Sequence, residues 1–553
     1  MKRFLIIAVL FCSFACGKKD IIDLPPVVDL DSIPDPEDVD PGQVFDVVIY
    51  GGTMSGIMAA VEVVNSGKTA VLINPVGSSL GGVTTNGLGV TDLSNPKSIG
   101  GLSKEFYTAL YTYYQNPSNW KYGQLASYEN LQRSAIDGMM LWFEPKAAQT
   151  VMRQFLEKYK IVIIESSRLD LNKGVNKNTK KAITSITMES GLKIKGRFFI
   201  DATYEGDLMA KAGVKYTVGR ESNSLYGETF NGIQRGTQST SIYQFQDGIR
   251  SGSDFLRLPF ADGTADNKVQ AYCYRMCLTD EPSNRVLISK PTDYNESDYE
   301  LVFSHINNNP GKFLFFNDFK KLPNNKTDSN NSGPISTDYV GQNYAYPDGD
   351  YVLREAISKK HKSYQLGLLW TLANHPKVPV NIRNYYKRWG LAKDEFTDNG
   401  NWPNQLYVRE ARRMISDYVM TERNCLGINQ APFSVGMADY PIDSHVVQRY
   451  VDEQGFIRNE GLIYGRVNKP YGIDYRSIIP SKSDCINLFV PICLSATHAA
   501  YGSIRMEPVF MTLGQSAACA AVKCLELNIS SIQDLAYSNL KPRLESRNVV
   551  LSY

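Results

Sequence analysis

The sequence predicts a protein of the α/β class whose main sheet is built from both ends of the chain. Three stretches lead to this prediction. Residues 45–74 have the pattern of a strand, a glycine turn, a helix and a second strand, and residues 146–166 add a helix and a third strand. Residues 486–527 contain an apolar strand, a loop and a long apolar helix. Strands alternating with helices are typical of a parallel sheet covered on both faces.

The first stretch has the arrangement that binds a dinucleotide. FDVVIY (45–50) is a short apolar and β-branched run, which favours a buried strand, and KTAVLIN (68–74) follows the helix as the second strand. Glycines between strand and helix let the backbone approach a pyrophosphate, and the helix N-terminus offers unpaired N–H groups. The predicted contact residues are Gly51, Gly52, Thr53, Met54, Ser55 and Gly56.

Two positions depart from the usual dinucleotide pattern. Thr53 stands at the middle glycine position, and Asn74 stands where an acidic residue normally ends the second strand. An asparagine can still accept a hydrogen bond from a ribose hydroxyl and donate one to it. The pattern therefore still predicts nucleotide binding, with weaker recognition of the ribose.

A second glycine-rich segment, residues 80–89, follows the second strand closely. Glycines there would allow the backbone to pass against a large flat cofactor. A flexible turn is the alternative interpretation. The residues expected to contact the cofactor are Gly81, Gly82, Val83 and Thr84.

The N-terminus has the pattern of an export signal. Basic residues precede an apolar run, and a small residue precedes Cys16. Residues 1–16 are therefore expected to be a lipoprotein signal peptide with lipidation at Cys16, and a plain signal peptide is the alternative. Residues 17–43 are rich in Asp and Pro and lack aromatic residues, so a disordered tether is expected. The predicted location is the periplasm, the outer membrane or the cell surface, with the lipid anchor in the membrane.

The composition bears on partners and metals. The net charge of +2 argues against nucleic acid as a partner, because phosphate binding needs a concentrated basic face. Seven cysteines follow the signal, without the spacing of a metal site. Cys273 and Cys277 lie close enough in sequence to pair or simply to be buried, and an inert buried thiol is expected at Cys519. No metal site is predicted.

The middle of the chain lacks the strand–helix alternation and carries polar segments. Residues 278–285 and 326–347 are rich in Asn, Asp and Tyr, which suit either sugar contact or ordinary turns. Residues 407–414 (YVREARRM) are predicted to be helical, with Arg409, Arg412 and Arg413 on adjacent turns. These arginines could bind a carboxylate or a pyrophosphate, or form salt bridges with local acids such as Glu410.

Longer motifs identify a family. YGGTMSG, LGGVTTNGLGVTD, FIDATYEGDLMAKAG, PIDSHVVQRYVDEQG and SATHAAYGSIRMEPVFMTLGQSA together resemble the FAD-dependent oxidoreductase family common in Bacteroidetes, related to glutathione-reductase-type flavoproteins. The resemblance covers nearly the whole chain after the tether. It implies FAD as cofactor and a discontinuous Rossmann-type FAD-binding domain, residues 44–214 and 461–553, with an inserted α+β substrate or cap region at 215–460.

The resemblance also implies particular cofactor contacts. Asp201, Ala202 and Thr203 would end an apolar strand (198–203) beneath the cofactor, after a charged hairpin at 167–197. Pro508 would begin a helix whose N-terminus points at the pyrimidine side of the flavin. The Gly-Asp pair that contacts the ribityl chain in many relatives is absent. Only one dinucleotide fingerprint is present, so no NAD(P)H domain is expected.

The predicted chemistry is oxidation of a small organic or carbohydrate hydroxyl, with hydride transfer to flavin N5 and a base for the hydroxyl proton. His498 is the first candidate for the base and His445 the second, while Tyr501 and Arg505 would orient the substrate. Structural histidines are the alternative. A carbohydrate lyase and a surface glycan-binding lipoprotein with a vestigial flavin fold are the alternative functions.

Overall fold

The computed structural model describes residues 42–235, 260–309, 321–331 and 333–553. The signal peptide, Cys16 and nearly all of the tether lie outside the described residues. The predictions of export, lipidation and a disordered tether therefore remain predictions.

The main sheet has seven strands and draws on both ends of the chain, as predicted. Its order is β5-β2-β1-β8-β7-β6, and β22 pairs with the second half of β8. Strands β5, β2, β1, β8 and β22 are parallel, while β6 and β7 form the predicted hairpin and pair antiparallel. The strands are β1 (Val44–Tyr50), β2 (Ala70–Ile73), β5 (Val162–Ile164), β6 (Val175–Lys177), β7 (Ile183–Thr187), β8 (Lys193–Asp201) and β22 (Leu488–Phe489).

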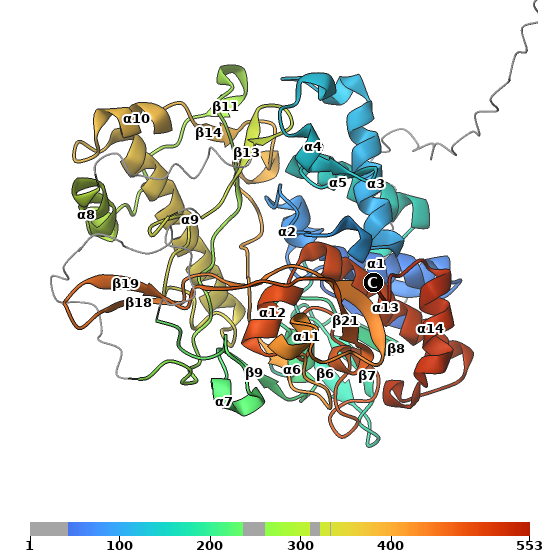
Figure 1. The fold of residues 1–553 in the computed structure, drawn as a ribbon. Coiled ribbons are helices and arrows are strands. Elements are labelled where there is room, and N and C mark those ends of the chain that lie inside the picture. Colours follow the sequence, from blue (N-terminus) through green and yellow to red (C-terminus); the bar gives the residue numbers. More distant parts are fainter. Residues whose placement is uncertain (1–41, 236–259, 310–320, 332) are drawn as a thin grey trace, which may run out of the picture.

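Helices from the two ends of the chain pack against each other beside this sheet (Figure 1). A side chain at Gly514 of α13 (Glu507–Glu526) would overlap the carbonyl oxygen of Ser55 in α1 (Met54–Asn65). Among the described helices, α13 alone is long and apolar enough to cross a membrane, but 94% of its most apolar window is buried inside the protein. It is therefore a core helix, flanked by α3 (Gly101–Gln115) and α14 (Tyr537–Ser546).

The middle of the chain forms a second, antiparallel sheet with its own helices. The order is β11-β14-β10-β13-β12. Its strands are β10 (Met276–Thr279), β11 (Arg285–Val286), β12 (Lys321–Leu322), β13 (Lys326–Ser329) and β14 (Gly390–Ala392), and its helices are α8 (Glu300–Asn308), α9 (Tyr351–Asn374) and α10 (Val380–Tyr386). In Figure 1 these helices stand on the left and α1 and α13 on the right.

Shorter elements connect these parts. The helices are α2 (Gly82–Thr85), α4 (Leu131–Ser134), α5 (Pro145–Tyr159), α6 (Asp207–Lys211), α7 (Asn223–Tyr226), α11 (Glu422–Cys425) and α12 (His498–Ile504). The strands are β3 (Ala135–Ile136), β4 (Met139–Met140), β9 (Tyr216–Thr217), β15 (Arg413–Met414), β16 (Ser434–Ala438), β17 (Ile442–Ser444), β18 (Gln448–Val451), β19 (Ile457–Glu460), β20 (Ile463–Gly465) and β21 (Tyr471–Asp474).

The helix predicted at residues 407–414 is wrong. This segment is extended and ends in β15, which pairs antiparallel with β9. The arginines are buried and bind carboxylates from several separate segments. These long-range ion pairs outweigh the local preference of the segment for a helix. The strand predicted at 486–492 is also shorter than expected, since only Leu488 and Phe489 pair with β8.

Candidate cofactor site and the adjoining histidine–arginine network

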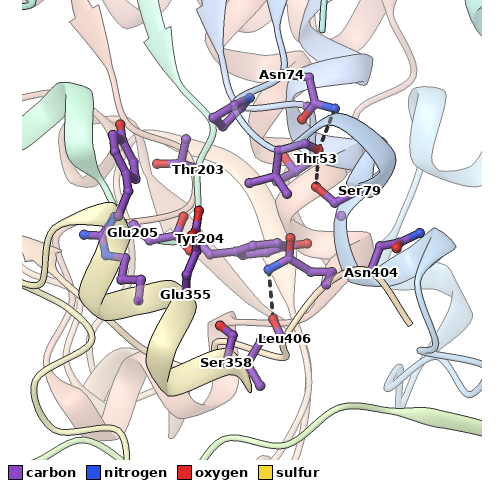
Figure 2. Close-up of a pocket in the computed structure, with 18 of the residues that line it drawn as sticks. Thr53, Asn74, Ser79, Thr203, Tyr204, Glu205, Glu355, Ser358, Asn404 and Leu406 are labelled. Atoms are coloured by element: carbon purple, nitrogen blue, oxygen red, sulfur yellow. Dashed lines mark hydrogen bonds between the residues drawn. The ribbon is translucent and has the colours of Figure 1, made fainter. Parts of the chain in front are cut away.

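A pocket of about 350 Å³ lies where β1 and β2 end, between the first glycine turn and helix α9 (Figure 2). The structure brings six of the residues predicted to bind a cofactor into its lining: Gly51, Gly52, Thr53, Asn74, Gly82 and Thr203. The other predicted cofactor residues do not line the pocket: Met54, Ser55, Gly56, Gly81, Val83, Thr84, Asp201, Ala202 and Pro508.

The first glycine turn is held close to the end of β8. Gly51 has a φ of 122°, and a side chain there would overlap the carbonyl carbon of Ala202. The Thr53 hydroxyl donates to the Ala202 carbonyl (2.8 Å) and accepts from the N–H of Gly56 (3.3 Å), which caps α1. The threonine that replaces the middle glycine thus ties the turn to the neighbouring strand.

Asn74 is oriented as a hydrogen-bond acceptor toward this turn. Its amide nitrogen donates to the carbonyl oxygens of Val76 (3.1 Å) and Gly77 (2.9 Å) and to the Glu165 carboxylate (2.7 Å). The amide oxygen therefore faces Gly52, where an added Cβ would lie 2.5 Å from it. Glu165 is not among the predicted site residues, although an acidic residue near the end of the predicted third strand is a signal for it. An acid is thus present beside the ribose position, contributed by the next strand.

The second glycine-rich segment is ordered and packs against the first. The Gly81 N–H donates to the Gly52 carbonyl (2.6 Å), and a side chain at Gly82 would overlap the Tyr204 hydroxyl. The Val83 N–H donates to the same hydroxyl (3.1 Å). These contacts favour a fixed cofactor wall over the alternative of a flexible turn.

Glu507 links this wall to the N-terminus of α13. It accepts hydrogen bonds from the Thr84 hydroxyl (2.6 Å) and the Tyr204 hydroxyl (2.8 Å). Burial raises the pKa of Glu507 to about 7, because its partners are neutral hydroxyls. Pro508 follows in the first turn of the helix, as predicted, but Glu507 makes the contact with the glycine-rich segment.

Asp201 organises the turn after β8. Its carboxylate accepts from the Thr203 N–H (3.1 Å), the Thr203 hydroxyl (2.6 Å) and the Met209 N–H (2.8 Å). Burial raises the pKa of Asp201 to about 6 despite these hydrogen bonds. Thr203 is the member of the predicted Asp-Ala-Thr element that lines the pocket.

The four predicted catalytic residues do not line this pocket; they lie in a buried network of ions. His498 Nδ1 lies 2.8 Å from the Glu410 carboxylate, and its Nε2 is buried without a hydrogen-bond partner among the described residues. His445 Nδ1 lies 2.7 Å from Asp338. Gln270 connects the two histidine residues, since its side chain donates to Glu410 (3.1 Å) and accepts from the backbone N–H of His445 (3.2 Å).

Tyr501 and Arg505 are carried by α12 and the residues that follow it. Arg505 donates to Asp443 (2.9 Å) and to the Tyr407 hydroxyl (3.2 Å), and its Nε is buried without a hydrogen-bond partner in the described chain. The Tyr501 ring is buried against Phe510, with 6.3 Å between ring centroids. The structure therefore places His498 at the start of α12, Tyr501 within this helix and Arg505 directly after it.

The charges in this network are compensated within the protein. Burial alone would raise the pKa of Glu410, but His498 and Arg413 hold it at about 2. Arg409 and then His445 likewise hold the pKa of Asp338 at about 2 against the effect of burial. The pKa of His445 is lowered by burial and by Arg409.

The arginines of 407–414 form salt bridges with acidic residues, which confirms the second of the two roles predicted for them. Arg409 pairs with Asp338 (3.1 Å), Arg412 with Asp207 (2.7 Å), and Arg413 with Glu221 (2.6 Å) and Glu410 (2.9 Å). None of the three arginines lines the pocket.

The polar segment 326–347 is also used internally, since Asp328 binds Arg275 and Asp338 binds Arg409. Sugar contact by it or by 278–285 remains a prediction. The seven described cysteines are buried and unpaired, Cys273, Cys277 and Cys519 included. Across the described ranges, no group of three or more His, Cys, Asp and Glu side chains is placed to hold a metal.

The fold and the pocket define a dinucleotide-binding α/β protein. The glycine turn ahead of α1, the acceptor at Asn74 and the long pocket between them suit the diphosphate and ribose of FAD. Residues 46–544 match the family model described as FAD dependent oxidoreductase, and the chain belongs to this family. It is therefore an FAD-dependent oxidoreductase with FAD as its cofactor.

Similar solved structures are flavoenzymes of distant sequence. The L-amino acid deaminase from Proteus vulgaris is 15% identical, with 32% of this chain and 52% of that chain covered and a TM-score of 0.23. L-Proline dehydrogenase from P. horikoshii is 14% identical, with coverage of 42% and 67% and a TM-score of 0.22. The matched region is about half the length of the first of these structures. No curated protein matches the sequence.

Proposed function

We propose that this chain oxidises a hydroxyl group of a small organic or carbohydrate substrate at the cell envelope. FAD, when bound, supplies the acceptor for the two electrons removed from the substrate. The N-terminal sequence pattern supports the location, and the polar middle region supports a hydroxylated substrate. The proposed organisation is a glutathione-reductase-type FAD domain, interrupted by a substrate region at 215–460, in a lipoprotein of the type found in Bacteroidetes.

The observation that carries the proposal is the His498–Glu410 pair. The carboxylate accepts from Nδ1–H and so leaves Nε2 as the ring atom that would exchange a proton with a substrate. Nε2 is buried and has no hydrogen-bond partner among the described residues, so no other described protein group occupies it. Protein atoms cover Nε2 in this structure, and the proposal therefore requires that the substrate hydroxyl reach it.

Arg505 and Tyr407 supply groups that would orient a polar substrate beside this histidine. The Arg505 guanidinium is held by Asp443 and Tyr407 at the end of α12, one helix length from His498. Its buried Nε has no hydrogen-bond partner in the described structure and could donate to a substrate oxygen. His498 would take the proton of the substrate hydroxyl, while Arg505 would bind another oxygen of the same substrate.

The test is anaerobic mixing of the purified holoprotein with separate panels of sugars, polyols and amino acids. A sugar or polyol is expected to bleach the absorption band of the oxidised flavin. His498→Asn is expected to retain FAD and to slow this bleaching at least about 100-fold. His375→Asn is the matched control, because His375 also pairs with a glutamate, Glu296 at 3.2 Å, but lies at the end of α9.

Each result bears on a separate part of the proposal. Bleaching by amino acids alone would overturn the hydroxyl substrate. Bleaching by a sugar at an unchanged rate in His498→Asn would overturn the role of His498 while keeping the substrate class.

A further inference from the structure

One face of α9 lines the pocket on the side opposite the first glycine turn. The lining residues on this helix recur every three or four positions: Tyr351, Arg354, Glu355, Ser358, Lys359 and Lys362. At 1.5 Å per residue this face is about 16 Å long. Figure 2 shows Glu355 and Ser358 on one side of the pocket and Thr53 and Asn74 on the other. The middle region of the chain therefore forms a full wall of the cofactor pocket.

The charged groups at the start of this face are neutralised by the protein. Arg354 binds Asp207 (2.6 Å), and Arg168 of the opposite wall binds Glu355 (2.5 Å). The third lining acid, Glu205, is buried and accepts from the Tyr346 hydroxyl (3.1 Å), and burial raises its pKa. No lining carboxylate is thus left to neutralise a further cation.

Two cations on the next turns have no such partner. Lys359 and Lys362 form no ion pair or hydrogen bond with any described residue, although both line the pocket. The Lys362 ammonium lies over the Trp402 ring, 5.6 Å from its centroid, and burial without a carboxylate lowers its pKa. Lys362 is partly buried and Lys359 is exposed at the edge of the pocket, and two unpaired cations on one wall favour an anionic ligand in the pocket.

We propose that Lys359 and Lys362 bind the diphosphate of FAD from the α9 side, opposite the N-terminus of α1. Ammonium groups act as point charges for phosphate oxygens, and two of them match the two charges of a diphosphate. The N-terminus of α1 supplies backbone N–H groups from the other side. Bound FAD would then connect the main sheet to the middle region. The inference rests on FAD as cofactor and is independent of the proposed hydroxyl substrate.

An anionic substrate is the other possible source of the same negative charge. A substrate carboxylate would also be attracted by two unpaired lysines. The two sources differ in one measurable property: FAD affinity depends on the lysines only if they contact the cofactor. Riboflavin provides the internal comparison, because it carries the flavin ring without any phosphate.

The experiment is titration of the protein, freed of flavin, with FAD and separately with riboflavin, followed by flavin fluorescence. The double variant Lys359→Gln/Lys362→Gln is expected to raise the Kd for FAD at least about 10-fold and to leave the Kd for riboflavin unchanged. The Kd for FAD should also depend less on salt concentration in this variant than in the wild type. Lys360→Gln is the matched control, since Lys360 lies on the same turn but outside the pocket lining. It is expected to bind FAD like the wild type.

Three outcomes would overturn the proposal. The double variant could bind FAD with wild-type affinity. It could keep that affinity but show a raised KM for an anionic substrate, which would assign the lysines to the substrate. It could also lose FAD and riboflavin equally, which would indicate general damage. Circular dichroism of the variants is expected to match the wild type, because the lysines make no ion pair in the described structure.

Discussion

Glu410 and Glu507 are both fully buried, but the two regions around them give these acids opposite properties. Glu410 lies among arginines and histidines, and its pKa is held at about 2. Glu507 lies on the cofactor wall between neutral hydroxyls, and its pKa is raised to about 7. Burial disfavours the charged form in both places, and only the ionic network supplies opposing charge. The comparison shows that Glu410 carries a charge that its neighbours balance, whereas Glu507 has only neutral partners and so holds its proton more tightly.

The largest effect is expected in the ionic network. Glu410→Gln removes a charge that His498 and Arg413 both depend on, so the free energy of unfolding should fall by about 3–5 kcal/mol. Urea unfolding at pH 7 measures this fall. Glu545→Gln is the control, because Glu545 is exposed and 3.8 Å from Lys541; it should change stability by less than about 0.5 kcal/mol. A small effect at Glu410 would mean that the network is not tightly coupled.

A smaller effect, in which the substitution raises stability at high pH, is expected at Glu507 on the cofactor wall. The native pKa of Glu507 is raised from 4.5 to about 7, so the native state holds the proton more tightly. The contribution of Glu507 to the free energy of unfolding is fully present below pH 4.5. It decreases by about 3 kcal/mol as the pH rises to about 7. Glu507→Gln should therefore match the wild type at pH 4 and exceed its stability at pH 8. Identical pH profiles of unfolding would contradict the assignment.

The smallest effect is expected at Glu165, beside the first glycine turn. Glu165 is exposed, and the hydrogen bond that it accepts from Asn74 directs the Asn74 oxygen toward Gly52. Glu165→Gln should weaken FAD binding about fivefold, equivalent to about 1 kcal/mol, and should leave riboflavin binding unchanged, because only FAD carries the adenosine ribose. Equilibrium titration measures both affinities, with Glu157→Gln on α5 as the control. An unchanged FAD affinity would show that Asn74 needs no support from Glu165.

The sequence by itself determined the parts of the protein that follow from local pattern. The strand–turn–helix–strand unit at 45–74, the hairpin before β8 and the helix that begins at Pro508 could be predicted, because apolar period and glycine position act over a few residues. The same local signals identified Gly51, Gly52, Thr53, Asn74 and Gly82, and the family resemblance identified Thr203; all six line the pocket.

Only the tertiary structure decided which distant side chains meet. The arginines of 407–414 suggested a helix, but their carboxylate partners lie on separate segments, and the need to neutralise buried charge made the chain extended. Glu507, Lys359 and Lys362 carry no local signal of their roles, because each role depends on a contact, or on the lack of an ion-pair partner, between different elements. Short-range pattern determined the backbone of the cofactor site, while long-range pairing of charges determined its chemistry.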